Sequence, residues 1–236
     1  MLKNIVDLVV NQIRIFPVDI IPLGLINTKS CVEKIRDTLS VNEVGVLPSI
    51  DGKDVIVFRK GELKEDNELV VINKVEVEPR RIIIEVAGTS KAGNKVYELF
   101  MSSLAALTNI DLGSLQSPLL LAETTRCVAT LDFTFEELFN RSFVEFLNKK
   151  VNKEATNDAA EGSIRPLAAI TEISYRVKDE ALINNKISMN PKQLTIAPRP
   201  GAPLDEKKYV ISSPFNSDTH IKLIEELNKA ITLTGV

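Results

Sequence analysis

The chain has 236 residues, of which 44% are hydrophobic and 26% are charged. This composition is typical of a folded globular protein and excludes a largely disordered chain. The 29 basic and 32 acidic residues give a formal net charge of −3, so the molecule as a whole does not attract phosphates.

The start of the chain is apolar but is interrupted by Asp7 and Arg14, and no small-residue cleavage site follows it. We therefore expect no signal peptide. No uncharged apolar run approaches the roughly 18 residues of a membrane helix, which favours a cytoplasmic protein. The two cysteines, Cys31 and Cys127, are far apart and are predicted to be small buried side chains rather than metal ligands or a disulfide.

The first part of the chain alternates predicted strands with two helices. Residues 4–16 are rich in β-branched side chains and predict a half-buried strand. Ser30 and Glu33 have the spacing of a capping box, which predicts a short helix over about 30–40. Strand patterns then follow at 44–48, 54–59, 68–74 and 80–87, with a tight turn at Asp51-Gly52 between the first two. A helix over about 93–108 has apolar residues at helical spacing.

The second part repeats this order after a linker at 111–118. A long strand is predicted from Leu119 to Phe133, and Thr134-Phe-Glu-Glu137 is a second capping box. The box is expected to open a helix to about Val151, whose phenylalanine-rich stripe would anchor the core. Strands are predicted at 165–178, 186–197 and 207–213, and a last helix is capped by Ser217 or Asp218.

These elements predict an α+β protein made of two similar halves of antiparallel sheet covered by helices. The halves are residues 1–111 and 112–236, packed together or forming one domain. The order of elements resembles the repeat of the TATA-binding-protein fold, although no specific motif carries the resemblance. It implies a saddle-shaped sheet, but in those saddles phenylalanine wedges project from the open sheet face, whereas here the phenylalanines gather on a predicted helix.

The segment Gly88-Thr-Ser-Lys-Ala-Gly93 joins a strand to a helix, which is the context of a phosphate-binding loop. It lacks the endings of the known nucleotide loops. Thr89, Ser90 and Lys91 are candidates for holding one anion, and the alternative is an ordinary connection with a helix cap. Arg14 and Arg126 lie in predicted strands and would meet phosphates if they share an open sheet face; otherwise they line edges.

No catalytic arrangement is recognised in the sequence. The single histidine, His220, lies beside Asp218 at the start of the last helix and is predicted to face solvent, without a nucleophile placed near it. No metal site and no cofactor are expected.

Three functions remain open. The first is a non-catalytic binding or assembly module that uses a sheet face or edge, as a homodimer or with a protein partner. The second is a saddle-like nucleic-acid-binding protein. The third is an enzyme acting on an anionic small molecule near residues 88–95.

Overall fold

The fold is known from a computed structural model that describes residues 5–48, 54–65, 68–106, 113–139, 141–154, 166–174, 180–185 and 191–234. The strands are β1 (Ile5–Ile15), β2 (Glu43–Pro48), β3 (Asp54–Glu65), β4 (Glu68–Val77), β5 (Arg81–Ala87), β6 (Leu120–Thr130), β7 (Ala169–Ile173), β8 (Lys192–Pro198) and β9 (Lys208–Ser213). The helices are α1 (Leu23–Ile26), α2 (Lys29–Thr38), α3 (Ser90–Ala105), α4 (Gly113–Gln116), α5 (Arg141–Glu154), α6 (Glu180–Asn184) and α7 (Ser217–Thr234), with 3₁₀ turns η1 (Phe135–Leu138) and η2 (Leu204–Glu206).

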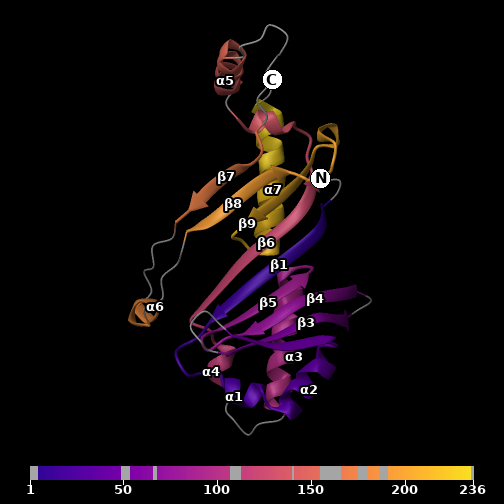
Figure 1. The fold of residues 1–236 in the computed structure, drawn as a ribbon, viewed down its shortest axis with the longest axis vertical. Helices are drawn as coiled ribbons and strands as arrows, with labels where there is room; N and C mark the ends of the chain where they lie inside the picture. Colours follow the sequence, from indigo (N-terminus) through magenta and orange to yellow (C-terminus); the bar gives the residue numbers. More distant parts are fainter. Residues whose placement is uncertain are drawn as a thin grey trace.

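The strands form one nine-stranded sheet in the order β2-β3-β4-β5-β1-β6-β9-β8-β7 (Figure 1). Every neighbouring pair is antiparallel. The predicted α+β class, with a large antiparallel sheet, is therefore confirmed. β1 lies at the centre and is hydrogen-bonded to β5 on one side and to β6 on the other.

The two long helices α3 and α7 lie on the same face of the sheet. On β1, Gln12 contacts the start of α3, and it is paired with Glu123 of β6. Alternation along β6 then places Cys127 on that face as well, where it contacts His220 of α7. We call this the covered face and the opposite one the outer face.

Two apolar clusters make up the core. The first lies under α2 and α3 and contains the fully buried Phe16, Phe58 and Phe100. The second lies along α7, where Phe133 and Phe135 both stack on the ring of Tyr209. Burial of apolar surface in these clusters is the main force that holds the sheet and helices together.

Most strands predicted from the sequence are present within a few residues of their expected bounds. The first capping box is wrong in detail, because α2 begins at Lys29 and Ser30 lies inside it. The second box is present around Thr134, but the helix that it opens ends after one turn at Leu138. The predicted turn at 51–52 lies outside the described residues.

The prediction that the helix beyond Thr134 anchors the core is wrong for most of its length. Phe135 is 3% exposed, whereas Phe143 and Phe146 on α5 are 54% and 55% exposed. In Figure 1, α5 stands apart from the sheet at the upper end of the molecule. Its apolar stripe therefore lies outside the two core clusters. Among the described residues, no helix is long and apolar enough to cross a membrane.

Candidate functional site

The predicted anion loop forms the N-terminal cap of α3. Thr89 is the cap residue, and its hydroxyl accepts a hydrogen bond from the Ala92 amide. The Ser90 amide donates to Ser217 Oγ at 3.1 Å, and the Ser217 amide donates to Ser90 Oγ at 2.9 Å. The starts of α3 and α7 thus cap each other, and two of the amides that an anion would need already have partners. Lys91 is exposed.

Below this cap, the buried Gln12 on β1 is the centre of a polar cluster. Its amide nitrogen donates to the Ser90 carbonyl at 3.1 Å and to Asn94 Oδ1 at 3.0 Å, and it also contacts Glu123. Gln12 Oε1 accepts from Arg14 Nη1 at 3.0 Å. The side chain is fully buried, so these contacts replace those it would make with water.

Gly93 of α3 makes room for this cluster. A Cβ atom at position 93 would lie 2.7 Å from Gln12 Oε1 and 2.8 Å from Gln12 Cδ. Real Cβ contacts are almost never this short, so the close approach of α3 to β1 requires glycine here.

Arg14 extends the cluster toward the surface. Its guanidinium donates to Asn94 Oδ1 at 2.7 Å and lies 4.1 Å from the centre of the Tyr97 ring, as a cation–π contact. The residue is 4% exposed, and burial lowers the pKa of Arg14 while the nearby Tyr97, Glu123 and Glu98 oppose this shift. Among the described residues, no carboxylate forms an ion pair with it.

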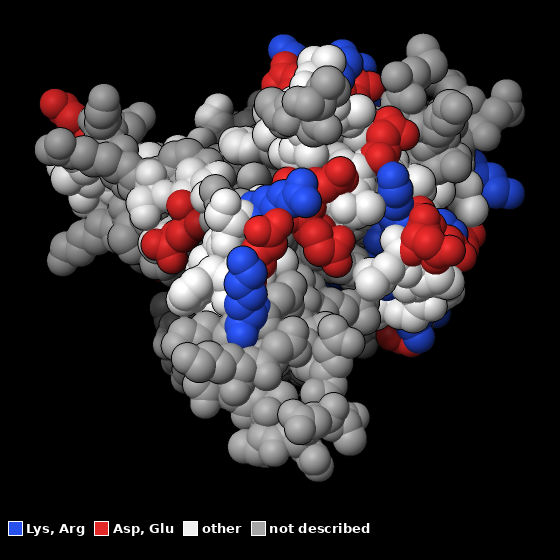
Figure 2. All heavy atoms as spheres, turned by 90° about the horizontal axis from the view of Figure 1, so that it is seen from above, with Lys and Arg blue, Asp and Glu red and all other residues white. Residues whose placement is uncertain are grey.

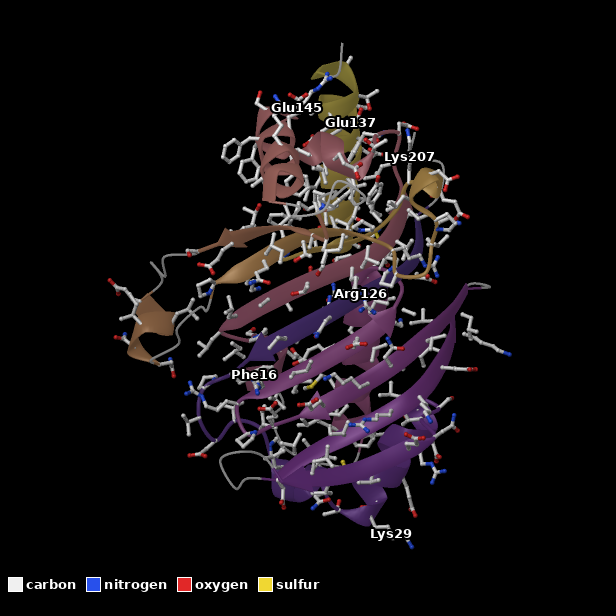
Figure 3. All side chains as sticks on the ribbon, turned by 45° about the horizontal axis from the view of Figure 1, so that its top comes forward. Phe16, Lys29, Arg126, Glu137, Glu145 and Lys207 are labelled. Atoms are coloured by element: carbon white, nitrogen blue, oxygen red, sulfur yellow. The ribbon has the colours of Figure 1, made fainter. Side chains whose placement is uncertain are left out.

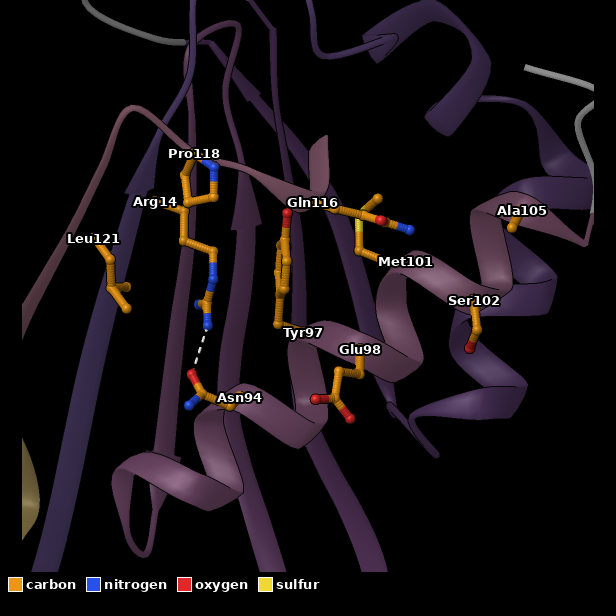
Figure 4. A pocket seen from close by; sticks show the side chains of 10 residues that line it. All are labelled: Arg14, Asn94, Tyr97, Glu98, Met101, Ser102, Ala105, Gln116, Pro118 and Leu121. Atoms are coloured by element: carbon orange, nitrogen blue, oxygen red, sulfur yellow. Dashed lines mark hydrogen bonds between the residues drawn. The ribbon is translucent and has the colours of Figure 1, made fainter. Parts of the chain in front are cut away.

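Arg14 forms part of the wall of a groove of about 620 Å³ that runs along α3 (Figure 4). One wall consists of successive turns of the helix, from Asn94 to Ala105. The opposite wall comes from β1, the start of β6 and the segment before it, and includes Pro118 and Leu121. Tyr97 Oη donates to the Leu115 carbonyl and so ties α4 to α3 at one end of the groove.

Arg126 points the other way. It is exposed on β6 (Figure 3), and the neighbouring Thr125 and Cys127 are buried on the covered face. Strand alternation therefore places Arg126 on the outer face and Arg14 on the covered face. The structure does not bring the two sequence-selected arginines together.

His220 belongs to a buried trio that sequence reasoning missed. The prediction that it faces solvent is wrong, because the residue is 0% exposed. Its Nε2 lies 3.3 Å from Cys127 Sγ, and its Nδ1 lies 2.7 Å from Ser213 Oγ. The pairing of β6 with β9 brings Cys127 near Ser213, and the packing of α7 on these strands adds His220. No local pattern in the sequence reveals this trio.

This trio resembles a cysteine nucleophile with its base, but both groups are held neutral. Burial raises the pKa of Cys127 to about 11 and lowers the pKa of His220 to about 4. A thiolate–imidazolium pair is therefore strongly disfavoured, and the thiolate is the reactive form of cysteine. The trio joins α7 to the sheet. No cluster of three or more metal-ligating side chains occurs within the described ranges.

Among the residues that the structure describes, β2 and β7 are the two edge strands of the sheet. On β2, three apolar side chains are exposed: Val44 at 37%, Val46 at 46% and Leu47 at 45%. An apolar edge strand of this kind offers unpaired backbone groups for pairing with another chain.

Comparison with known proteins gave no match to a family model, to a curated protein or to a solved structure.

Proposed function

We propose that this chain is a non-catalytic binding or assembly protein that docks a second copy of itself or a protein partner on the outer face of its sheet. The main support is the apolar content of the outward side of β1. Gln12 and Arg14 point toward the covered face together with Val10, whereas Val9, Ile13 and Ile15 point outward together with Asn11 and stay half-buried. The open side of an ordinary half-buried strand is mainly polar.

The outer face continues this apolar character on the neighbouring strands. Ile83 of β5 pairs with Ile13, and Ala122 of β6 pairs with Ile13 from the other side. Asn11, paired with Glu85 and Thr124, forms a polar row beside these apolar side chains. An apolar surface bordered by polar residues is typical of protein interaction sites. The exposed β2 edge provides a second place for strand pairing.

Analytical ultracentrifugation over a concentration series tests the self-assembly form of this proposal. We expect the wild-type chain to dimerise and Ile13→Glu to shift it toward the monomer, because a buried unpaired carboxylate is unfavourable at an apolar interface. Val18→Glu is the matched control, since Val18 is 55% exposed outside the sheet. A dimer that persists in Ile13→Glu would contradict docking on this face. A wild-type chain that is monomeric throughout would restrict the proposal to a different partner.

Nucleic-acid binding is a second candidate, and it rests on a proposed structural repeat. The N-cap Thr89 accepts from Ala92, and the N-cap Asn216 accepts from Thr219, while Ser90 and Ser217 are 127 residues apart. β9 begins 127 residues after β5, and α7 begins 127 residues after α3. No insertion or deletion therefore separates the two pairs of elements. β1 and β6 are each 11 residues long. These correspondences support two similar halves and the resemblance to the TATA-binding-protein saddle.

Charge makes this second candidate weaker. On the outer face Lys74 is paired with Glu76 at 3.0 Å, and Glu85 lies on the next strand. Figure 2 shows basic and acidic side chains lying among one another at the end of the molecule drawn there. A gel-shift measurement at low salt, where phosphate attraction is greatest, compares the wild type with Arg126→Glu. Loss of a shifted band in the variant would favour the saddle, and no shifted band with wild type would remove it.

The third candidate, an enzyme acting near residues 88–95, has less support. The Ser90 amide and the Ser217 amide are each already hydrogen-bonded to a serine hydroxyl. We therefore favour a non-catalytic protein over this third candidate.

A further inference from the structure

The groove along α3 combines one buried cation with an otherwise largely apolar wall. Arg14 lies at one end beside Asn94 and Tyr97, and Met101 and Ala105 continue along the helix. Leu121 of β6 faces them and is 43% exposed. An apolar cleft with a few convergent polar groups is the usual form of a small-molecule site.

The charges around Arg14 leave room for one anion. Glu123 is close enough to both Arg14 and Lys192 to act on each electrostatically. Glu123 is also hydrogen-bonded to Gln12 and, at 3.4 Å, to Ser90 Oγ. The half-buried Glu123 thus acts on two cations. Glu98 also acts on Arg14, but it is exposed on the rim, where water and salt screen its charge.

The Arg14 guanidinium has N–H groups beyond those used within the cluster. Two of its N–H groups are used, one by Gln12 Oε1 and one by Asn94 Oδ1. Arginine has five N–H donors, arranged as a fork that matches the two oxygens of a carboxylate. The neighbouring ring of Tyr97 and the buried Gln12 hold that fork in place. One guanidinium and an acidic rim fit a single negative charge better than a dianion such as phosphate.

We propose that this groove binds an elongated amphipathic carboxylate, with its head group on Arg14 and its apolar chain along α3. The helix rises about 1.5 Å per residue, so the wall from Asn94 to Ala105 is roughly 16 Å long. This length suits a medium alkyl chain. The site is on the covered side of the sheet and is independent of docking on the outer face.

The test is isothermal titration calorimetry with dodecanoate, below its micelle concentration. Dodecyltrimethylammonium, which has the same chain and the opposite charge, is the head-group control. We expect dodecanoate to bind the wild type and to bind Arg14→Met about tenfold or more weakly, because a charge-assisted hydrogen bond is lost. Dodecyltrimethylammonium should bind much more weakly than dodecanoate.

A second variant blocks the groove without touching the buried cluster. Ser102 is exposed on the groove side of α3, and Ser102→Trp should also weaken dodecanoate binding about tenfold, because the large ring fills the space of the chain. Lys229→Trp, on an exposed position of α7, is the matched control and should leave binding unchanged.

The proposal is overturned if dodecanoate does not bind, or if Ser102→Trp and Lys229→Trp bind it equally well. Equal affinity for the two probes would overturn the role of Arg14. If Arg14→Met fails to fold by circular dichroism, the Ser102→Trp comparison and the two probes still decide the outcome.

Discussion

Gly93 is the residue on which the close packing of α3 against β1 depends most directly. Gly93→Ala would place a methyl group 2.7 Å from Gln12 Oε1, and Gln12 is held by Arg14 and Asn94. We expect the variant to lose about 1 kcal/mol of unfolding free energy, because overpacking exceeds the gain in helix propensity. Urea denaturation measures this loss. Gly24→Ala in α1 is the control, since no atom lies within 4 Å of its new Cβ, and equal stability of the two variants would contradict the packing argument.

His220 makes stability depend on pH. Burial lowers its folded-state pKa from 6.5 to about 4, so the unfolded chain binds a proton first as the pH falls. Stability is fully present above pH 6.5 and falls toward pH 4, by roughly 3 kcal/mol at most. It is the only histidine in the chain, so His220→Gln should remove most of this dependence between pH 7 and 5. Urea denaturation at each pH measures the unfolding free energy of wild type and variant. If the two free energies change with pH in the same way, the histidine is not buried in its neutral form.

Sequence patterns predicted the candidate site only in part, and β1 explains why. Strand alternation places Val10, Gln12 and Arg14 on one side of β1. Which side meets helices is a tertiary property, and here the more polar side is covered. The sequence places Arg14 on a sheet face, but it does not reveal that this face is covered by α3. The groove and the His220 trio depend on strand pairings between residues far apart in the chain.

At the scale of elements, regular apolar spacing predicted β1, β5 and α3 well, and it failed for α5. A stripe of phenylalanines at helical spacing occurs both in a helix that packs on a core and in a helix that projects from it. The spacing shows that the helix has one apolar face, but it does not show what that face packs against. The capping box at Thr134 was also real, yet it marked a single 3₁₀ turn. Local hydrogen bonding fixes where a helix starts, and tertiary packing decides how far it continues.

The position of α5 leads to a stability prediction. The double variant Phe143→Ser and Phe146→Ser should change the unfolding free energy by less than about 0.5 kcal/mol, as is usual for exposed positions. Phe135→Ala should cost about 3–5 kcal/mol, because that ring is buried against Tyr209 and Phe139. Thermal or urea unfolding compares the two. A large loss in the double variant would mean that α5 packs against the body of the protein.

At the scale of the whole molecule, β1 connects the two core clusters because it is hydrogen-bonded to a strand on each side. Ser90 and Ser217 add a second connection between the helices. We therefore expect both clusters to unfold together, as a single domain does. Phe100→Ala removes a fully buried ring from the first cluster and should destabilise it by about 3–5 kcal/mol.

Hydrogen exchange followed by mass spectrometry distinguishes shared from separate unfolding. If the clusters are coupled, Phe100→Ala should speed exchange in β9 as much as in β5, although the substituted ring belongs only to the first cluster. Ile224→Ala is the reciprocal variant in the second cluster and should speed exchange in β5. If the exchange rate of β9 is the same in Phe100→Ala and in the wild type, each half unfolds alone. Only in that case does loss of the Phe100 ring destabilise the first cluster without destabilising the second.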